Sequence, residues 1–192
     1  MNGTVAAVIL AAGRGERFGG EQAKPCVVVD GRPMVSWVQD AAVGAGLGPV
    51  VLVVGDRAGQ VRELAAPGVE VVVNPDPEAG IASSLHRALE WLASRGIVHA
   101  AVIGLADQPW IQADAWSKVA AAYDEGASLA VATYRGVRAN PVLLGREIWP
   151  EALALRGDEG ARQLMRRLPV TEVDCTGFGD PQDVDTPDDL ER

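Results

Sequence analysis

The stretch VILAAGRGERFGGEQAKP, residues 8–25, decides the fold and points to the chemistry. Residues 5–10 are apolar without alternation, which predicts a strand buried on both faces of a parallel sheet. The loop that follows opens at the carboxyl edge of that sheet, where open α/β sheets bind ligands. Its glycine N–H groups, together with Arg14, Arg17 and Lys24, indicate an anion receptor suited to a polyphosphate.

The rest of the chain alternates apolar strands with amphipathic helices. We expect buried strands at residues 49–54, 69–73, 99–105 and 129–133, and helices at residues 34–45, 57–66, 81–95 and 114–123. This alternation predicts an α/β fold, a three-layer α/β/α sandwich with a mostly parallel, Rossmann-like sheet. The final third is less regular, and there we expect one antiparallel strand, a helix at 157–168 and a strand at 170–174.

Length, composition and charge narrow the class of protein. A chain of 192 residues with 48% hydrophobic residues predicts a single compact domain over residues 1–192. The net charge of −9 argues against a general nucleic-acid or anionic membrane surface. We find neither a signal peptide nor an apolar run of the ~20 residues that cross a bilayer. Cys26 and Cys175 have no pairing motif, so we expect a cytoplasmic protein with two ordinary thiols.

Two common glycine-rich motifs do not fit the first loop. A P-loop needs Gly-Lys-Ser/Thr at the start of a helix, whereas Lys24 is followed by Pro25. The dinucleotide fingerprint G-x-G-x-x-G is one residue shorter than the glycine spacing over residues 13–19. A long loop with two separated cations remains, and Arg17 and Lys24 can hold different phosphates of a nucleoside triphosphate.

The motif LAAGxGxRFG at residues 10–19, followed by Lys24, resembles the signature loop of the MobA-like nucleotidyltransferases, which have a glycosyltransferase-A-like fold. Within that superfamily the chain is most similar to the branch of molybdenum cofactor cytidylyl- and guanylyltransferases. Further segments resemble motifs of this branch in the same order, namely Asn74-Pro75 with Gly80 and Ser83-Ser84, residues 104–109, residues 157–162 and residues 183–189.

The resemblance implies an activity: Mg²⁺-dependent transfer of CMP from CTP to a phosphorylated acceptor, expected to be molybdopterin, with release of pyrophosphate. The cytidylyl enzymes read Leu-Ala-Ala-Gly where the guanylyl enzymes read Leu-Ala-Gly-Gly, so Ala12 favours CTP. The acceptor stays open, because Ala139-Asn140-Pro141 stands where cytidylyl enzymes usually read Gly-His-Pro. Residues 1–110 would form the nucleotide-binding part, and residues 111–192 the acceptor-binding and C-terminal part. A molybdoenzyme receiving the product is an implied partner.

The resemblance also implies roles for single residues. Asp107 and Asp185 would hold Mg²⁺, with Asp183 as an alternative to Asp185. Arg17 would bind the β- and γ-phosphates and Lys24 the region of the α-phosphate, so that Arg17, Lys24 and Asp107 form the catalytic set. The residues expected to contact the nucleotide are Leu10, Ala11, Ala12, Gly13, Arg17, Lys24, Asn74 and Ser83.

Other interpretations compete with these roles. Asn74 can simply shape a turn before Pro75, Asp107 can be a turn residue before Pro109, and Asp158 can cap a helix. At the level of function, the alternatives are a guanylyltransferase, an NTP transferase acting on another phosphorylated small molecule, and a non-catalytic nucleotide- or cofactor-binding chaperone.

Overall fold

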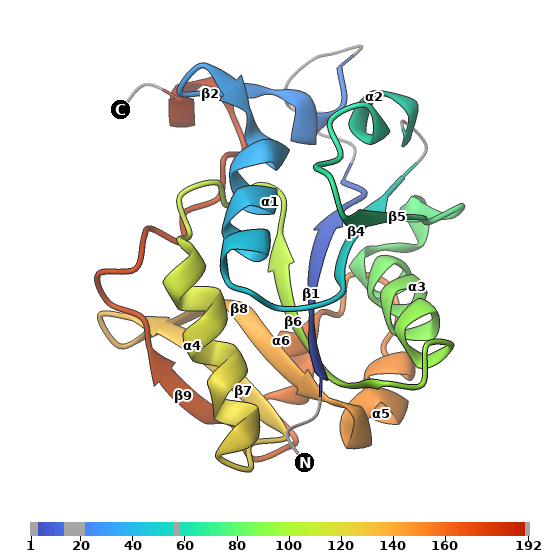
Figure 1. Cartoon of the computed structure of the whole chain (residues 1–192), viewed down its shortest axis with the longest axis vertical. Helices are drawn as coiled ribbons and strands as arrows, with labels where there is room; N and C mark the ends of the chain where they lie inside the picture. Colours follow the sequence, from blue (N-terminus) through green and yellow to red (C-terminus); the bar gives the residue numbers. More distant parts are fainter. Residues whose placement is uncertain (1–3, 14–21, 56–57, 191–192) are drawn as a thin grey trace.

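A seven-stranded sheet forms the centre of the protein in a computed structural model that describes residues 4–13, 22–55 and 58–190 (Figure 1). The strand order is β5-β4-β1-β6-β8-β7-β9. Among the described strands of this sheet, β8 alone runs antiparallel to its neighbours, β6 and β7. The expected sheet, mostly parallel with one antiparallel strand in the C-terminal third, is confirmed. The strands are β1 (Thr4–Ala11), β4 (Val50–Val54), β5 (Val69–Val73), β6 (Val98–Leu105), β7 (Leu129–Tyr134), β8 (Val137–Gly145) and β9 (Thr171–Asp174).

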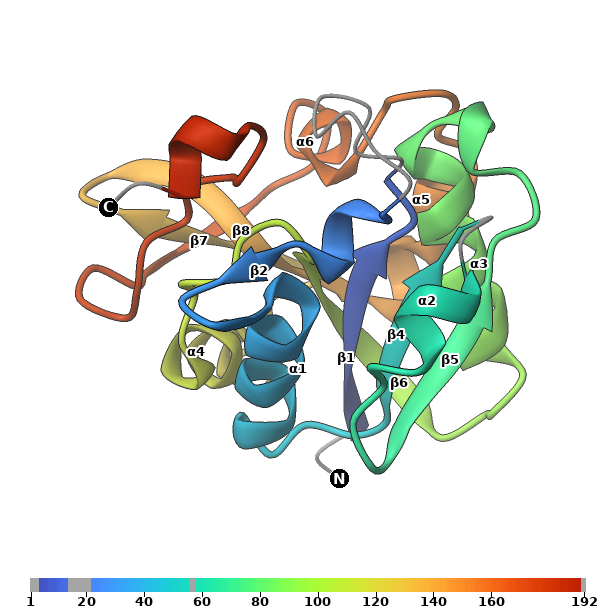
Figure 2. The same ribbon diagram turned by 90° about the horizontal axis from the view of Figure 1, so that it is seen from above.

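Helices cover both faces of the sheet and complete the three layers (Figure 2). Successive side chains of β1 enter two separate cores, because Ile9 packs on one face while Val8 and Leu10 pack on the other. The first core includes α1 (Met34–Gly44), α2 (Ala58–Arg62) and α4 (Ala113–Asp124), and the second includes α3 (Ile81–Ala93), α5 (Trp149–Leu153) and α6 (Ala161–Leu164).

Local sequence explains how the chain enters α1. Asp30 and Gly31 both have positive φ, 48° and 77°, and form the tight turn between β2 (Val28–Val29) and β3 (Arg32–Pro33). Pro33 is then the N-cap of α1. None of the described helices is long and apolar enough to cross a membrane. Both cysteines are free and buried.

Two elements depart from the expected boundaries for identifiable reasons. Helix α2 ends at Arg62 because the buried Gln39 side chain hydrogen-bonds the Leu64 carbonyl and the Ala66 amide, which would otherwise continue the helix. Strand β8, the antiparallel strand, begins at Val137, ahead of the apolar residues 142–144, because a tight turn at Arg135 and Gly136 folds it directly back on β7.

The C-terminal third holds the largest difference. The expected helix over 157–168 is wrong in extent, since only α6 is helical there and residues 157–160, which begin with Gly157 at a φ of 60°, form a loop. The short helix α5, which we did not expect, has a proline in its first turn, a position that favours helix starts. Gly160 is the N-cap of α6 and no side chain caps it, so Asp158 does not have the predicted capping role.

Substituting Gly104 tests the packing between the sheet and α4. A Cβ added at Gly104 would lie 2.4 Å from ring carbons of Trp116, a side chain that is 1% exposed. Gly104→Ala should therefore lower the free energy of unfolding by about 1–3 kcal/mol through overpacking. Urea denaturation of both proteins measures this free energy of unfolding. Gly59→Ala in α2 is the control, because nothing lies near its added Cβ. Equal effects at both positions would contradict this packing.

Candidate active site

The candidate site lies where β1 and β6 end side by side. The chain leaves β1 towards β4 and β5 and then returns to β6 on the other side of β1, so the carboxyl ends of β1 and β6 mark a topological switch point. A small pocket there is lined by Leu10, Ala11, Gly13, Lys24 and Asp107. The structure thus gathers four of the residues expected to contact the nucleotide, together with the expected metal ligand Asp107. Arg17 lies outside the described residues.

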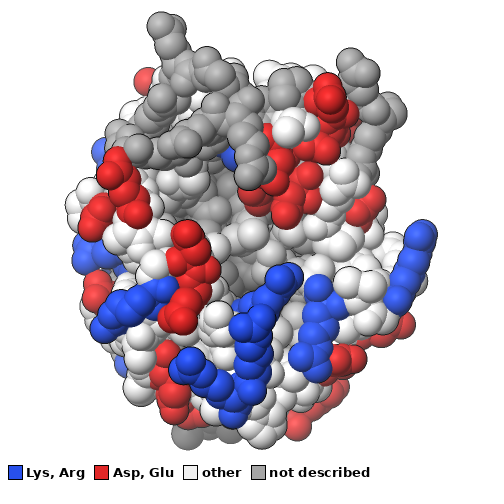
Figure 3. Space-filling model, turned by 180° about the vertical axis from the view of Figure 1, so that it is seen from behind, with Lys and Arg blue, Asp and Glu red and all other residues white. Residues whose placement is uncertain are grey.

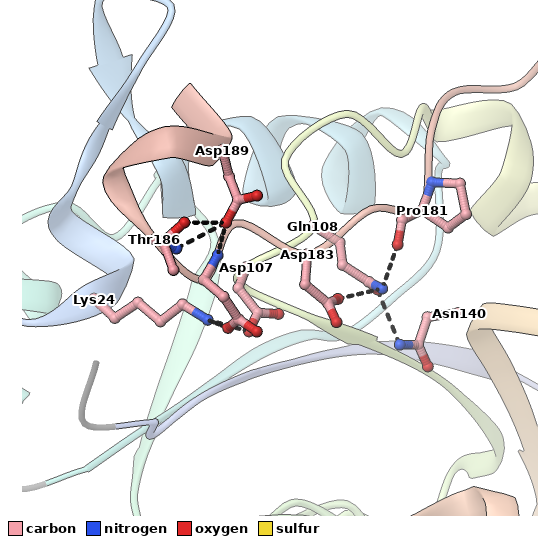
Figure 4. Close-up of polar contacts among 9 residues, drawn as sticks. Lys24, Asp107, Gln108, Asn140, Pro181, Asp183, Thr186 and Asp189 are labelled. Atoms are coloured by element: carbon pink, nitrogen blue, oxygen red, sulfur yellow. Dashed lines mark hydrogen bonds and ion pairs between the residues drawn. The ribbon is translucent and has the colours of Figure 1, made fainter. Parts of the chain in front are cut away.

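Lys24 is held between two carboxylates from distant parts of the chain (Figure 4). Its Nζ lies 2.6 Å from Asp107 Oδ2 and 2.7 Å from Asp185 Oδ1. The side chain is 12% exposed. Burial by itself lowers the pKa of Lys24, but Asp107 and Asp185 outweigh it and leave the pKa above its ordinary value. The ammonium group therefore stays charged.

Backbone contacts fix each of these three side chains. Lys24 begins the short helix η2 (Lys24–Cys26), and the preceding amide of Ala23 donates to Gln60 Oε1 at 2.8 Å. The Asp107 carbonyl accepts from the Val184 amide at 2.8 Å. This hydrogen bond joins the C-terminal segment, residues 175–190, to the end of β6. Asp189 Oδ2 accepts from the Asp185 amide at 3.0 Å, which shapes the turn that carries Asp185.

The Gln108 side chain also binds the C-terminal segment through hydrogen bonds (Figure 4). Its Nε2 donates to the Pro181 carbonyl and to Asp183 Oδ1, both at 2.8 Å, and its Oε1 accepts from Asn140 Nδ2 at 2.9 Å. Burial and then the charge of Asp107 raise the pKa of Asp183. The sequence left Asp183 and Asp185 as alternatives, and the structure separates them: Asp185 contacts Lys24, while Asp183 accepts from Gln108.

The carboxylates could hold a hard cation. Asp107 Oδ1 is buried and has no hydrogen-bond partner, which leaves a desolvated anionic oxygen at the site. Among the described residues there is no group of three or more His, Cys, Asp or Glu side chains that could hold a metal ion. A cation bound by Asp107 and Asp185 would complete its coordination with water and phosphate oxygens, as Mg²⁺ characteristically does.

A larger pocket of about 650 Å³ adjoins this site, sharing Leu10 with the smaller one. Leu10, Ile103, Leu105 and Val142 are among the apolar residues that line it. Figure 3 shows a hollow on one face of the molecule, with acidic side chains on its upper side and basic side chains below it. The two pockets therefore meet at Leu10, near the end of β1.

Helix α3 forms one wall of the large pocket, and Gly80 at its start allows the close approach of the loop at Gly157. The φ of Gly80 is 89°, and a Cβ there would lie 2.2 Å from the Gly157 carbonyl carbon, so only glycine permits the close approach. The Ala82 amide donates to the Gly157 carbonyl at 3.1 Å. This contact brings Asp158 and Arg162 to the edge of the large pocket.

Asn74 and Ser83 are joined to each other. Asn74 Nδ2 donates to Ser83 Oγ at 2.7 Å and to Ser84 Oγ at 3.0 Å, and its Oδ1 accepts from the Asp76 amide. Asn74 is 1% exposed. Neither Asn74 nor Ser83 lines the two pockets described above. The turn-shaping interpretation of Asn74 therefore fits these contacts.

Sequence reasoning missed the Gln108–Asn140 pair. Both residues carried a weak signal, since Gln108 directly follows Asp107 and Asn140 is the position that departs from the resembled Gly-His-Pro. Their contact joins residues 32 positions apart, Gln108 in the loop after β6 and Asn140 in β8, which no motif spacing reveals.

Comparison with known proteins now identifies the family. Residues 7–173 match the MobA-like NTP transferase domain. The chain belongs to this family. The described domain is therefore one of the nucleotidyltransferase class. The predicted superfamily is confirmed.

Individual relatives show how far the similarity extends. The purine catabolism protein PucB of Bacillus subtilis is 27% identical over 195 residues, covering 96% of this chain and 93% of PucB. The bifunctional protein GlmU of Maricaulis maris is 33% identical over 153 residues, covering 79% of this chain and 33% of GlmU. The chain spans a third or less of the length of the first GlmU proteins it matches.

Solved structures give the same fold. Rv0371c from Mycobacterium tuberculosis H37Rv superposes with a TM-score of 0.86 at 30% identity, covering 100% of this chain and 97% of Rv0371c. A complex of Rv0371c with manganese gives a TM-score of 0.82 at 29% identity, covering 98% and 97% of the two chains. These similarities confirm the nucleotidyltransferase fold.

The charge balance around Gln108 yields a stability prediction. Gln108→Glu replaces the Nε2 donor with an oxygen that would face the Pro181 carbonyl and Asp183, so two hydrogen bonds become repulsive contacts. We expect the free energy of unfolding to fall by about 2–4 kcal/mol at pH 7. Urea denaturation measures the change.

Gln163→Glu on α6 is the matched control, because it adds the same charge beside Arg166, a favourable partner. It should change stability by less than about 0.5 kcal/mol. A Gln108→Glu protein as stable as this control would show that the Gln108 amide does not hold the segment.

Proposed function

We propose that the protein is a Mg²⁺-dependent cytidylyltransferase that joins CMP from CTP to a phosphorylated acceptor, molybdopterin, and releases pyrophosphate. The observation that carries the proposal is the placement of Lys24 between Asp107 and Asp185 at the switch point. Beside it lies a pocket of about 650 Å³, within the size range of small-molecule sites.

The chemistry explains why such a site needs both signs of charge. An acceptor phosphate oxygen attacks the α-phosphorus of CTP, and the bond from that phosphorus to the pyrophosphate oxygen breaks. Both reactants are anions, so the site must neutralise them and hold them in line. The attacking phosphate is already ionised and needs no general base. Lys24 would place its charge near the α-phosphate, and Arg17 would hold the phosphates that leave.

Asp107 and Asp185 would hold the divalent cation. The Lys24 ammonium already lies within hydrogen-bond distance of both carboxylates, which supports their ability to share a cation. Bound Mg²⁺ would supply further neutralisation of the phosphate charge. The manganese complex of Rv0371c supports the use of a divalent metal in a related protein.

The residues at the end of β1 support CTP as the donor. Small side chains at Ala11 and Ala12 would allow the edge of a base to approach the backbone of residues 10–13. The Leu-Ala-Ala-Gly sequence is the form that accompanies the cytidylyl enzymes in the resembled branch. A guanylyltransferase, or transfer to a different phosphorylated molecule, would keep the same centre. A pure binding chaperone has no need of the paired carboxylates and lysine. A molybdoenzyme would receive the product.

A nucleotide and acceptor panel tests the proposal. The purified protein is incubated with Mg²⁺, reduced molybdopterin and each of the four NTPs, and pyrophosphate release is measured. We expect release with CTP. Release with GTP alone would make the protein a guanylyltransferase. Absence of release with every NTP, despite nucleotide binding, would overturn both assignments.

Asp107→Asn tests the acidic centre directly. The substitution keeps the shape of the side chain but removes its charge, so turnover should fall by about 10²–10³-fold or more while the thermal midpoint shows an intact fold. Asp40→Asn is the control, because Asp40 lies on α1 and makes an exposed ion pair with Arg32 of β3. Near-normal turnover of Asp107→Asn would remove Asp107 from the site.

A further inference from the structure

The Gln108 side chain is a buried amide with both ends engaged. It is 5% exposed, and it bonds the Pro181 carbonyl, Asp183 and Asn140. Asn140 lies in β8 and lines the large pocket. Gln108 therefore connects the segment that carries the acidic centre to the wall of the pocket beside it.

The backbone fixes which way both amides face. The Pro181 carbonyl can only accept, so the Gln108 amide must turn its Nε2 towards it. Gln108 Oε1 then faces Asn140, and an oxygen there requires the donor, Nδ2, of Asn140. Figure 4 shows the Asn140 side-chain oxygen turned away from Gln108. The Pro181 carbonyl thus fixes the orientation of both amides, and it leaves Asn140 Oδ1 directed away from Gln108.

The surroundings make this oxygen selective. Asn140 is half-buried, whereas the charged residues that line the same pocket are exposed: Arg138, Asp158, Arg162 and Arg166. Apolar side chains, including Val142 two positions along β8, form much of the remaining lining. An oriented carbonyl oxygen in such a setting strongly favours a ligand that brings a donor and penalises one that leaves it unpaired.

We propose that Asn140 is a specificity-determining residue for the acceptor, which it recognises through an N–H or O–H group on the acceptor's ring, and that Gln108 is the positioning residue that orients it. The inference rests on the proposed nucleotidyl transfer and adds what the second substrate must carry. The acceptor is then a phosphorylated ring compound with a hydrogen-bond donor directed at Asn140 Oδ1.

Steady-state kinetics with reduced molybdopterin and CTP tests this role. Asn140→Leu keeps the size of the side chain and removes both polar ends. It should raise the KM for molybdopterin by about 10-fold or more and leave the KM for CTP within about twofold. Asn140→His should restore most of the affinity, because a neutral imidazole offers one donor and one acceptor nitrogen.

Coupling between the two residues tests the positioning role. Gln108→Met should also raise the KM for molybdopterin. The double variant Asn140→Leu/Gln108→Met should be no worse than Asn140→Leu alone, since both changes remove one oriented oxygen. A purely structural role would make the two effects additive. Thr133→Val is the control, because it removes a buried hydrogen-bonding hydroxyl on the neighbouring strand β7. Its KM values should match wild type.

The outcomes separate this inference from the proposed function. A wild-type protein that turns over, combined with an Asn140→Leu variant whose KM for molybdopterin is unchanged or rises together with that for CTP, overturns the role of Asn140 alone. A wild-type protein without turnover on any NTP overturns the proposed function, and the role of Asn140 with it.

Discussion

The pairing of one buried ammonium group with two carboxylates governs the arrangement of this protein. A charge placed as deep as Lys24 is stable only when it is paired, because burial without a partner costs several kcal/mol. Its partners, Asp107 and Asp185, come from the end of β6 and from the C-terminal segment. Three segments far apart in sequence must therefore meet at the switch point of the sheet.

The parallel sheet supplies the rigid frame for this meeting. β1 and β6 lie side by side with residues 6–9 and 100–103 buried, so their carboxyl ends hold Leu10 and Asp107 in fixed positions. The C-terminal segment has little regular structure and depends on specific bonds instead. The Val184 amide and the Gln108 side chain attach it to the end of β6, and buried Val184 packs against Met34. Stability and site geometry consequently share the same contacts.

The sequence predicted the elements that have strong local signals. Periodicity and the order of motifs predict the apolar run into residues 10–13 and the alternation of strands and helices. They also place Lys24 in the loop after the first strand and Asp107 at the end of a later one. The extent of α6 could not be predicted, because Gly157 and the packing of its loop on Gly80 override the helical pattern.

Tertiary contacts decided the remaining questions. Sequence could not choose between Asp183 and Asp185, since both lie in one acidic run and only the fold shows which faces Lys24. The Gln108–Asn140 bond was equally hidden, because the fold, and not residue type, brings the loop after β6 against β8. Asn74 was expected to contact the nucleotide because it lies in a motif that resembles the family. In the structure its polar atoms instead form hydrogen bonds in the turn before α3.

The central claim is that Asp107 and Asp185 form one cation site that works with the nucleotide. Electron paramagnetic resonance of Mn²⁺ binding, with and without CTP, tests it most directly. We predict one bound Mn²⁺ per wild-type chain in the presence of CTP, and at least about tenfold weaker binding in Asp185→Asn. Equal Mn²⁺ affinity in wild type and Asp185→Asn would contradict the account.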